Sequence, residues 1–404
     1  MLYHHLLVER FELMVGKMKN RVFFVGLTSL MLQSIGLADT LKGAFAEHFL
    51  MGTVWHGQPT EQHKKNHFLE KEKAITALEF NTITAENCMK PAALQPEQGA
   101  FNFAESDAMM AYAQAQDLVV VGHTLVWKNA TPSWFFLDKH GAQVSRDVLI
   151  ARLETHIRTV VEHYRGRIAY WDVVNEAIDT RWLPKQKRFE AFYKPTPWLE
   201  IIGPEYIEIA YRAAHKADPS VKLLYNDYGL HNEAKLDFAL AMIADLKSRG
   251  VQVDGLGYQG HLFIDQPALG DIERVLSKAR QAQIPLHITE LDVSVLPNAW
   301  KHRAASVEDR FALAAEFNPY VDGVPEDILT LQAKRYSELF KLLVKYSDNV
   351  ERVTFWGVWD GNSWRDYRPM LGRTDYPLLI GRNFERKPAY SAVLQVVTEQ
   401  EKKD

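Results

Sequence analysis

The sequence predicts an α/β protein built as a single (β/α)8 TIM barrel. Eight short apolar runs alternate with amphipathic segments over residues 40–400. Most of these runs are continuously apolar, which is typical of strands covered on both faces in a parallel sheet. A barrel fits this alternation and tolerates long insertions after its strands. An open doubly wound sheet is the alternative, but no glycine-rich phosphate loop follows the first predicted strand.

The predicted strands span residues 49–55, 80–87, 118–127, 168–176, 222–228, 253–262, 285–293 and 350–360. Helical periodicity lies between them, with apolar residues at every third or fourth position. It predicts helices at 147–164, 205–215, 233–247, 272–283 and 327–346. Two long irregular inserts, 179–204 and 296–325, follow the fourth and seventh strands. In a barrel, such connections lie on the face that carries the carboxyl ends of the strands, so we expect them to shape a cleft.

Composition excludes several classes of function. The formal net charge of -4 and pI near 6.4 provide no basic excess, so we expect no nucleic-acid partner. The single cysteine, Cys88, permits neither an internal disulfide nor a thiolate metal cluster, and we expect it to be a buried apolar side chain. The aromatic residues, 11% of the chain, include several at predicted strand ends, where flat apolar faces can meet a ligand.

The N-terminal 38 residues have the three zones of a bacterial secretory signal. A basic segment at 17–21 precedes an apolar run at 22–32, and Gly36 and Ala38 are small residues placed for cleavage. Translation would then start at Met18, and residues 1–17 would be an extension. We therefore expect a signal segment at 1–38 and a catalytic domain at 40–400. An N-terminal amphipathic helix of the domain is the alternative.

This signal predicts export to the periplasm or the medium, where a chain with one cysteine is not unusual. Thr28, Ser29 and Gln33 interrupt the apolar run, so we expect no stable membrane anchor after cleavage. If the segment is not a signal, the expected location is the cytoplasm.

Polar residues gather at the carboxyl ends of seven predicted strands. They are Glu86, Asn87 and Lys90; His123 and Trp127; Asn175 and Glu176; Tyr228; Gln259 and His261; Glu290 and Asp292; and Trp356 with Trp364. A single such residue would be an ordinary strand-end cap. Because these strand ends meet at one face of a barrel, the set predicts an active site there. Glu176 and Glu290 would be two acids facing one cavity.

The same residues lie in seven strings that appear in order over roughly residues 41–398. They are FNTITAEN at 80–87 followed by Met89 and Lys90, GHTLVW at 122–127, WDVVNE at 171–176, YNDY at 225–228, QGHL at 259–262, ITELDV at 288–293, and TFWGV at 354–358 with SWR at 363–365. In these strings the chain resembles the family 10 glycoside hydrolases, the endo-β-1,4-xylanases. An Asn-Glu pair alone would be weak evidence, whereas the ordered set is highly specific.

The resemblance implies a retaining hydrolysis of internal β-1,4-xylosidic bonds with no cofactor and no metal. Such a reaction needs a carboxylic acid near the leaving oxygen and a carboxylate about 5 to 5.5 Å away as nucleophile. Glu176 matches the family's acid/base and Glu290 its nucleophile. His261 would hydrogen-bond Glu290, and Asp292 would orient His261. We expect Glu176 to hold its proton because negative charge and tryptophan walls lie near it.

The resemblance also implies how xylan and xylooligosaccharides bind. Asn175 would bind the sugar 2-OH, and Gln259 matches a residue that contacts this site. The remaining predicted binding residues are Glu86, Asn87 and Lys90 on the glycone side, His123 and Trp127 as a wall, Trp356 and Trp364 as a cover, and Tyr228 beyond the cleavage point. In the family, the cover crowds the position of a hydroxymethyl group and favours xylose over glucose. We expect a monomer.

Several alternatives remain. A related barrel glycanase would act on β-1,4-glucan or mixed linkages, and a non-catalytic protein would hold the oligosaccharides without cutting them. A metal-dependent hydrolase would use His123, His261, His287 and Asp292 as ligands, although we expect His287 to be a core histidine. Trp134 and Trp171 are expected to pack, and the run 185–188 to be a solvated loop face. Lys128 and Gly229 depart from frequent family residues and concern outer subsites.

Overall fold

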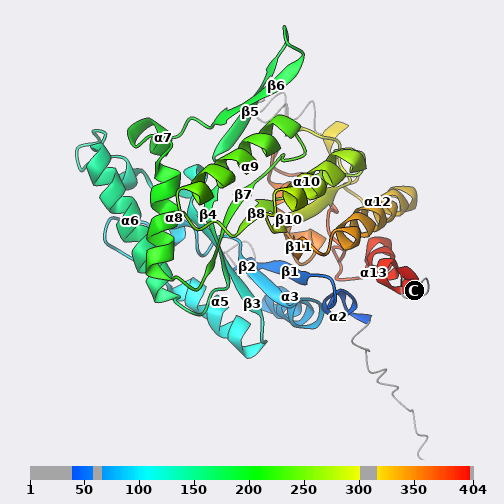
Figure 1. Cartoon of the computed structure of the whole chain (residues 1–404). Helices are drawn as coiled ribbons and strands as arrows, with labels where there is room; N and C mark the ends of the chain where they lie inside the picture. The colour runs from blue at the N-terminus through cyan, green and yellow to red at the C-terminus, as the bar shows by residue number, and fades with distance from the viewer. Residues whose placement is uncertain (1–38, 58–65, 301–315, 401–404) are drawn as a thin grey trace, which may run out of the picture. The chain divides into compact units, whose positions relative to one another are not determined.

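Eight parallel strands close into a barrel in the computed structural model, which describes residues 39–57, 66–300 and 316–400 (Figure 1). The strands are β1 Leu50–Trp55, β2 Thr82–Ala85, β3 Val119–Val126, β4 Tyr170–Asn175, β7 Lys222–Asp227, β8 Gly255–Tyr258, β10 Leu286–Ser294 and β11 Val350–Phe355. β11 pairs with both β1 and β10, and this closes the sheet. The predicted barrel is confirmed, and the open doubly wound sheet is wrong.

All eight predicted strands form, and the sixth is interrupted. Its second part is β9 His261–Phe263, which is separated from β8 by Gln259 and Gly260. Gly260 has φ +75, a conformation that glycine adopts without steric cost. β9 pairs with the end of β10, so that His261 stands opposite Asp292 in the parallel register. Because of this interruption, His261 lies outside β8 and beside the carboxyl-terminal half of β10.

Helices surround the barrel on the outside (Figure 1). They are α2 Leu41–Ala44, α3 Asn66–Glu79, α4 Pro91–Leu94, α5 Ala104–Ala115, α6 Arg146–His163, α7 Pro197–Ile201, α8 Tyr206–Ala217, α9 Glu233–Ser248, α10 Leu269–Gln281, α12 Glu326–Lys345 and α13 Pro388–Gln400. Each of the five predicted helices is present. Ser145 and Asn232 cap α6 and α9 by accepting backbone N–H bonds, which satisfies donors that a helix start leaves free.

Most of the residues that were expected to pack lie in the core, and Trp134 is partly buried against it. Trp171 is fully buried, and its ring occupies the place where a Cβ on Gly122 would lie. His287 is completely buried and makes an edge contact with Tyr170, with ring centroids 5.2 Å apart. Burial lowers the pKa of His287 well below its usual value, so the ring is neutral. His287 is therefore a core histidine, as predicted, and Cys88 is buried as well.

The insert after β4 is regular, which corrects one expectation. β5 Ile178–Leu183 and β6 Arg188–Tyr193 form an antiparallel hairpin that projects from the barrel, and α7 follows it (Figure 1). Sequence patterning missed the hairpin because most of its side chains are polar or exposed, so no continuous apolar run marks its strands. In the second insert, residues 301–315 lie outside the described part of the chain.

Within the described ranges, no helix has both the length and the apolar character needed to cross a membrane. The predicted signal segment, residues 1–38, falls outside those ranges.

Candidate active site

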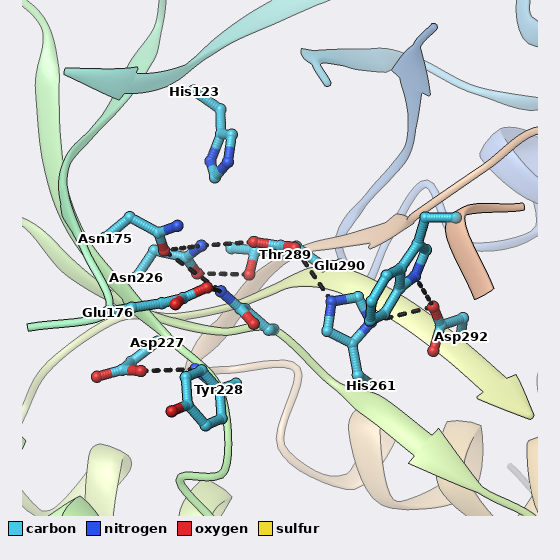
Figure 2. A network of polar contacts seen from close by, with 12 residues as sticks. His123, Asn175, Glu176, Asn226, Asp227, Tyr228, His261, Thr289, Glu290 and Asp292 are labelled. Atoms are coloured by element: carbon cyan, nitrogen blue, oxygen red, sulfur yellow. Dashed lines mark hydrogen bonds and ion pairs between the residues drawn. The ribbon is translucent and has the colours of Figure 1, made fainter. Parts of the chain in front are cut away.

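Glu290 lies in β10 and is the more enclosed of the two predicted catalytic acids. Its Oε1 accepts a hydrogen bond of 2.8 Å from Asn226 Nδ2, and its Oε2 lies 3.1 Å from His261 Nε2 (Figure 2). Asn226 Oδ1 in turn accepts from Thr289 Oγ1 at 2.6 Å. Both oxygens of Glu290 are therefore held by groups that are fixed in turn by other side chains.

A buried charge network stands behind this carboxylate. His261 Nδ1 lies 3.0 Å from Asp292 Oδ2, and Arg365 Nε donates to Asp292 Oδ1 at 2.8 Å. Trp364 Nε1 donates to Asp292 Oδ2 at 2.8 Å. His261 thus has one ring nitrogen on Asp292 and the other on Glu290. The structure therefore has the contacts expected of His261 with Glu290 and Asp292, and Arg365 adds a further contact to Asp292.

Electrostatics in this network favour an ionised Glu290. Burial disfavours the charged form of His261, but Asp292 and Glu290 outweigh it and raise the pKa of His261 to about 9. Burial also disfavours the Asp292 carboxylate, but Arg365 and His261 lower its pKa to about 2. Glu290 is likewise opposed by burial, yet the hydrogen bond from His261 and the nearby positive charge lower its pKa.

Glu176 follows β4 and has a different environment. Its backbone φ is +60, which is uncommon for a side chain other than glycine, and its N–H donates to Asn226 O at 2.9 Å. Oε1 accepts from Gln259 Nε2 at 3.3 Å, and Oε2 lies 3.4 Å from Lys194 Nζ. Glu176 therefore lies at the edge of the site and has a cation beside it, where the sequence analysis expected apolar walls.

Lys194 reaches Glu176 because it follows the hairpin directly. Its N–H donates to Ala177 O at 2.8 Å, which sets the end of β6 beside the residue after Glu176. Burial opposes the charge of Lys194, but Glu176 outweighs this and raises its pKa. Lys194 Nζ also lies 5.0 Å from the ring centroid of Tyr228.

Asn175 connects the two acids. Its Oδ1 accepts from Asn226 Nδ2 at 3.1 Å and from Gln259 Nε2 at 3.3 Å. Since Asn226 also binds Glu290 and Gln259 also binds Glu176, one hydrogen-bond network joins both carboxylates (Figure 2). Two bonds to Oδ1 fix the side-chain amide and leave its nitrogen as the donor for a ligand.

His123 and the tryptophan cover lie over this network. His123 is buried, with Nδ1 2.8 Å from Asp172 Oδ2, and its ring meets Trp356 edge-on at 5.3 Å between centroids. Trp364 packs on His261 at 4.6 Å. Trp364 thus also holds the charged network in place through its bond to Asp292, whereas Trp356 packs on His123.

The residues that end β2 form a second polar group. Lys90 Nζ donates to Asn87 Oδ1 at 2.9 Å and lies 4.9 Å from the ring centroid of Trp127. Glu86 Oε2 lies 3.8 Å from His56 Nε2. Burial opposes the charge of His56, but Glu86 and Glu72 raise its pKa to about 9. His56 is thus a cation that the sequence analysis missed, although it directly follows the first predicted strand.

Tyr228 lies near Glu176 (Figure 2) and is 36% exposed. Lys235 Nζ lies 3.7 Å from the ring centroid and forms a buried ion pair of 2.8 Å with Asp227. The ion pair holds Lys235 in place, and Lys235 in turn contacts the ring of Tyr228. A flat ring held in this way is suited to stacking on a sugar.

Several residues of the site were not singled out from the sequence. Asn226 and Arg365 lie inside recognised strings, and Asn226 also stands near the end of β7, so these positions could have identified them. Thr289 and Asp172 precede functional residues within strands. Lys194 had no comparable signal, because only the fold of the hairpin brings it to Glu176.

The set proposed as metal ligands is not gathered around one point. In the described ranges, no group of three or more His, Cys, Asp or Glu side chains is positioned to hold a metal ion. His123 and His261 each contact a carboxylate of their own, and His287 lies in the core.

Comparison with known proteins matches the model of glycosyl hydrolase family 10 to residues 40–396. Endo-1,4-beta-xylanase A of Xylanibacter ruminicola is 36% identical over 363 residues, covering 88% of this chain and 93% of that protein. The thermostable celloxylanase of Thermoclostridium stercorarium is 37% identical over 372 residues, with coverages of 88% and 87%. A GH10 endoxylanase structure from a sugarcane soil metagenome has a TM-score of 0.79 at 36% identity, covering 89% of this chain and 99% of that one.

Proposed function

The chain belongs to glycosyl hydrolase family 10, and from this premise we propose that Glu290 is the nucleophile and Glu176 the acid/base of a retaining endo-1,4-β-xylanase. The enzyme hydrolyses internal β-1,4-xylosidic bonds of xylan by double displacement. The observation that supports the two roles is the unequal surroundings of the acids. Glu290 is kept ionised by the buried charge network that contains His261. Glu176 lies at the edge of the site, where Lys194 and Gln259 donate hydrogen bonds to it.

In the first step, a Glu290 oxygen attacks the anomeric carbon of the sugar, and the glycosidic bond breaks as Glu176 gives its proton to the leaving oxygen. The negative charge on Glu290 is consumed in the glycosyl-enzyme. Asn226 and His261 fix the Glu290 carboxylate in one rotamer, so little reorganisation precedes attack.

In the second step, Glu176 accepts a proton from water as the water attacks the anomeric carbon, and the bond to Glu290 breaks. Lys194 and Gln259 stabilise the ionised form of Glu176 that this step requires. The free amide nitrogen of Asn175 is placed to bind the sugar 2-OH, an interaction that strengthens in the oxocarbenium-like transition state.

Alanine substitution of each acid tests the assignment. Glu290→Ala should lower xylan hydrolysis by roughly four orders of magnitude or more, because no group replaces the nucleophile. Glu176→Ala should lower it by about 10²- to 10⁴-fold, the usual contribution of a general acid. On an aryl xylobioside with a good leaving group, the first step needs no proton. Glu176→Ala should therefore still release the aryl group in a burst, whereas Glu290→Ala should not.

Glu351→Ala is the matched control, because Glu351 is a carboxylate at the amino-terminal part of β11, where it pairs with Lys222. Its activity should stay near that of the wild type. Normal xylan turnover by either catalytic variant would overturn the assignment.

Action on β-1,4-glucan is a second candidate, because one relative is named a celloxylanase. Trp356 and Trp364 support a preference for xylose, since they cover the site beside His123 and His261. Comparing xylan with carboxymethylcellulose measures this preference. The same assay with chelator tests a metal-dependent reaction, and reducing-end release distinguishes hydrolysis from binding alone.

We also propose that the protein is exported after cleavage near Ala38 and acts as a monomer. The zones of residues 17–38 support export. Mass spectrometry of the mature N-terminus distinguishes a start at Met1, a start at Met18 and cleavage after Ala38. Size-exclusion chromatography with light scattering measures the oligomeric state.

A further inference from the structure

The hairpin β5–β6 carries two large aromatic side chains that the active site does not use. Trp182 is 50% exposed and Phe189 is 44% exposed. They stand directly opposite each other in the antiparallel register, and their rings meet edge-on with centroids 5.1 Å apart. A cross-strand pair of this kind stabilises a hairpin, but stability alone does not require so much exposed ring surface.

The turn beside this pair is basic. Lys185, Lys187 and Arg188 are all exposed, and no carboxylate in the described part of the chain pairs with them. Nearby, Arg181 is already neutralised by Glu190, with Nε 2.6 Å from Oε2. The run 185–188, which was expected to be a solvated loop face, therefore places Lys185 and Lys187 in the turn next to the two exposed rings, while Arg188 lies on the opposite face of the hairpin.

Strand alternation places this pair on the face of the hairpin away from the catalytic acids. Tyr193 lies on the same face as Trp182 and Phe189, and it packs on Phe238 of α9 at 5.0 Å. Lys194, the next residue, has the opposite orientation and reaches Glu176. The hairpin projects beyond α9 (Figure 1), and the residues at its tip, 184–189, are exposed.

We propose that Trp182 and Phe189, with Lys185 and Lys187 of the turn, form a second polysaccharide-binding site for xylan that carries uronic acid branches. The rings would stack on the apolar faces of xylose units, and the cations would bind the branch carboxylates. This inference rests on the proposed function, because it takes xylan as the substrate. The site would hold the polymer while another segment of it occupies the cleft, which raises the local concentration of substrate.

Two variants separate the two parts of the site. Trp182→Ala/Phe189→Ala removes the rings and keeps the cations, with Leu331→Ala, an exposed apolar residue of α12, as its control. Lys185→Glu/Lys187→Glu keeps the rings and reverses the charge. Its control is Lys216→Glu/Lys247→Glu, which changes two exposed lysines elsewhere on the surface.

Binding is measured by sedimentation with insoluble glucuronoxylan and with xylan stripped of its branches. The aromatic variant should bind both polymers roughly tenfold more weakly than the wild type. The charge variant should lose affinity for glucuronoxylan alone, and added salt should weaken only that binding in the wild type. Both variants should hydrolyse short neutral xylooligosaccharides at the wild-type rate.

Unchanged binding of both variants to both polymers would overturn the proposal. The proposal would also be overturned if size-exclusion chromatography showed that the wild type is a dimer and the aromatic variant a monomer, because the rings would then serve self-association. A wild-type protein that cannot hydrolyse xylooligosaccharides would instead contradict the proposed function. The short substrates therefore tell the two failures apart.

Discussion

Glu290 lies within β10 and Glu176 directly follows β4 of the same barrel, yet the protein holds the two acids differently. Glu290 lies in front of a buried chain of His261, Asp292 and Arg365, with contacts of 2.6 to 3.1 Å. Glu176 has contacts of 3.3 and 3.4 Å to Gln259 and Lys194. A nucleophile must stay ionised in one rotamer, whereas an acid/base must gain and lose a proton in each cycle. The shorter contacts of Glu290 and the longer contacts of Glu176 match the different roles that we propose for them.

The largest expected effect is on stability, and it distinguishes Arg365, which supports the network of Glu290, from Lys194, which lies beside Glu176. Arg365→Met leaves the buried Asp292 carboxylate without its main counter-charge, which should lower the free energy of unfolding by about 3 to 5 kcal/mol. Lys194→Met, at the edge of the site, should change it by less than about 1 kcal/mol. Chemical denaturation at pH 7 measures both. Equal losses of unfolding free energy in the two variants would mean that the buried and the peripheral cation stabilise the protein to the same extent.

His261 tests the same contrast through pH. Its pKa is raised in the folded state, so its contribution to stability is complete below about pH 6.5 and is lost as pH rises through about 9. The wild type should therefore lose more unfolding free energy between pH 6.5 and 9 than His261→Gln does. A parallel pH dependence of the two proteins would contradict a charged His261.

The same substitution should also change catalysis. His261 lowers the pKa of Glu290, so His261→Gln should move the acid limb of kcat/KM to higher pH, by about one unit. The alkaline limb should stay in place, because His261 does not contact Glu176. Pre-steady-state measurement of the glycosylation step tests whether the shift belongs to the nucleophile.

The smallest expected effect concerns Lys194. Its Nζ lies 3.4 Å from Glu176, so Lys194→Met should slow the second step, which uses the Glu176 carboxylate as base, by roughly two- to fivefold, the usual worth of a partly exposed ion pair. Lys194→Arg keeps the charge and should retain the wild-type rate. Pre-steady-state kinetics separates the two steps, and a slower first step with an unchanged second step would mean that Lys194 acts on Glu290.

The sequence by itself determined the barrel, the eight strands and the two acids, together with the relay of His261 and Asp292. Strand periodicity and polar strand ends are local patterns, and a closed parallel barrel brings all such ends to one face. The ordered strings added the roles that we propose for individual residues. These features could therefore be predicted without knowing how any loop packs.

Only the tertiary structure decided what surrounds the acids. Asn226 and Gln259 join Glu176 to Glu290 because three different strand ends converge, and their hydrogen bonds are not written in any one segment. Lys194 reaches Glu176 because a hairpin returns the chain beside Ala177, which no apolar pattern signals. Long-range placement of polar side chains depends on loop geometry, and loop geometry is settled by packing across the whole barrel.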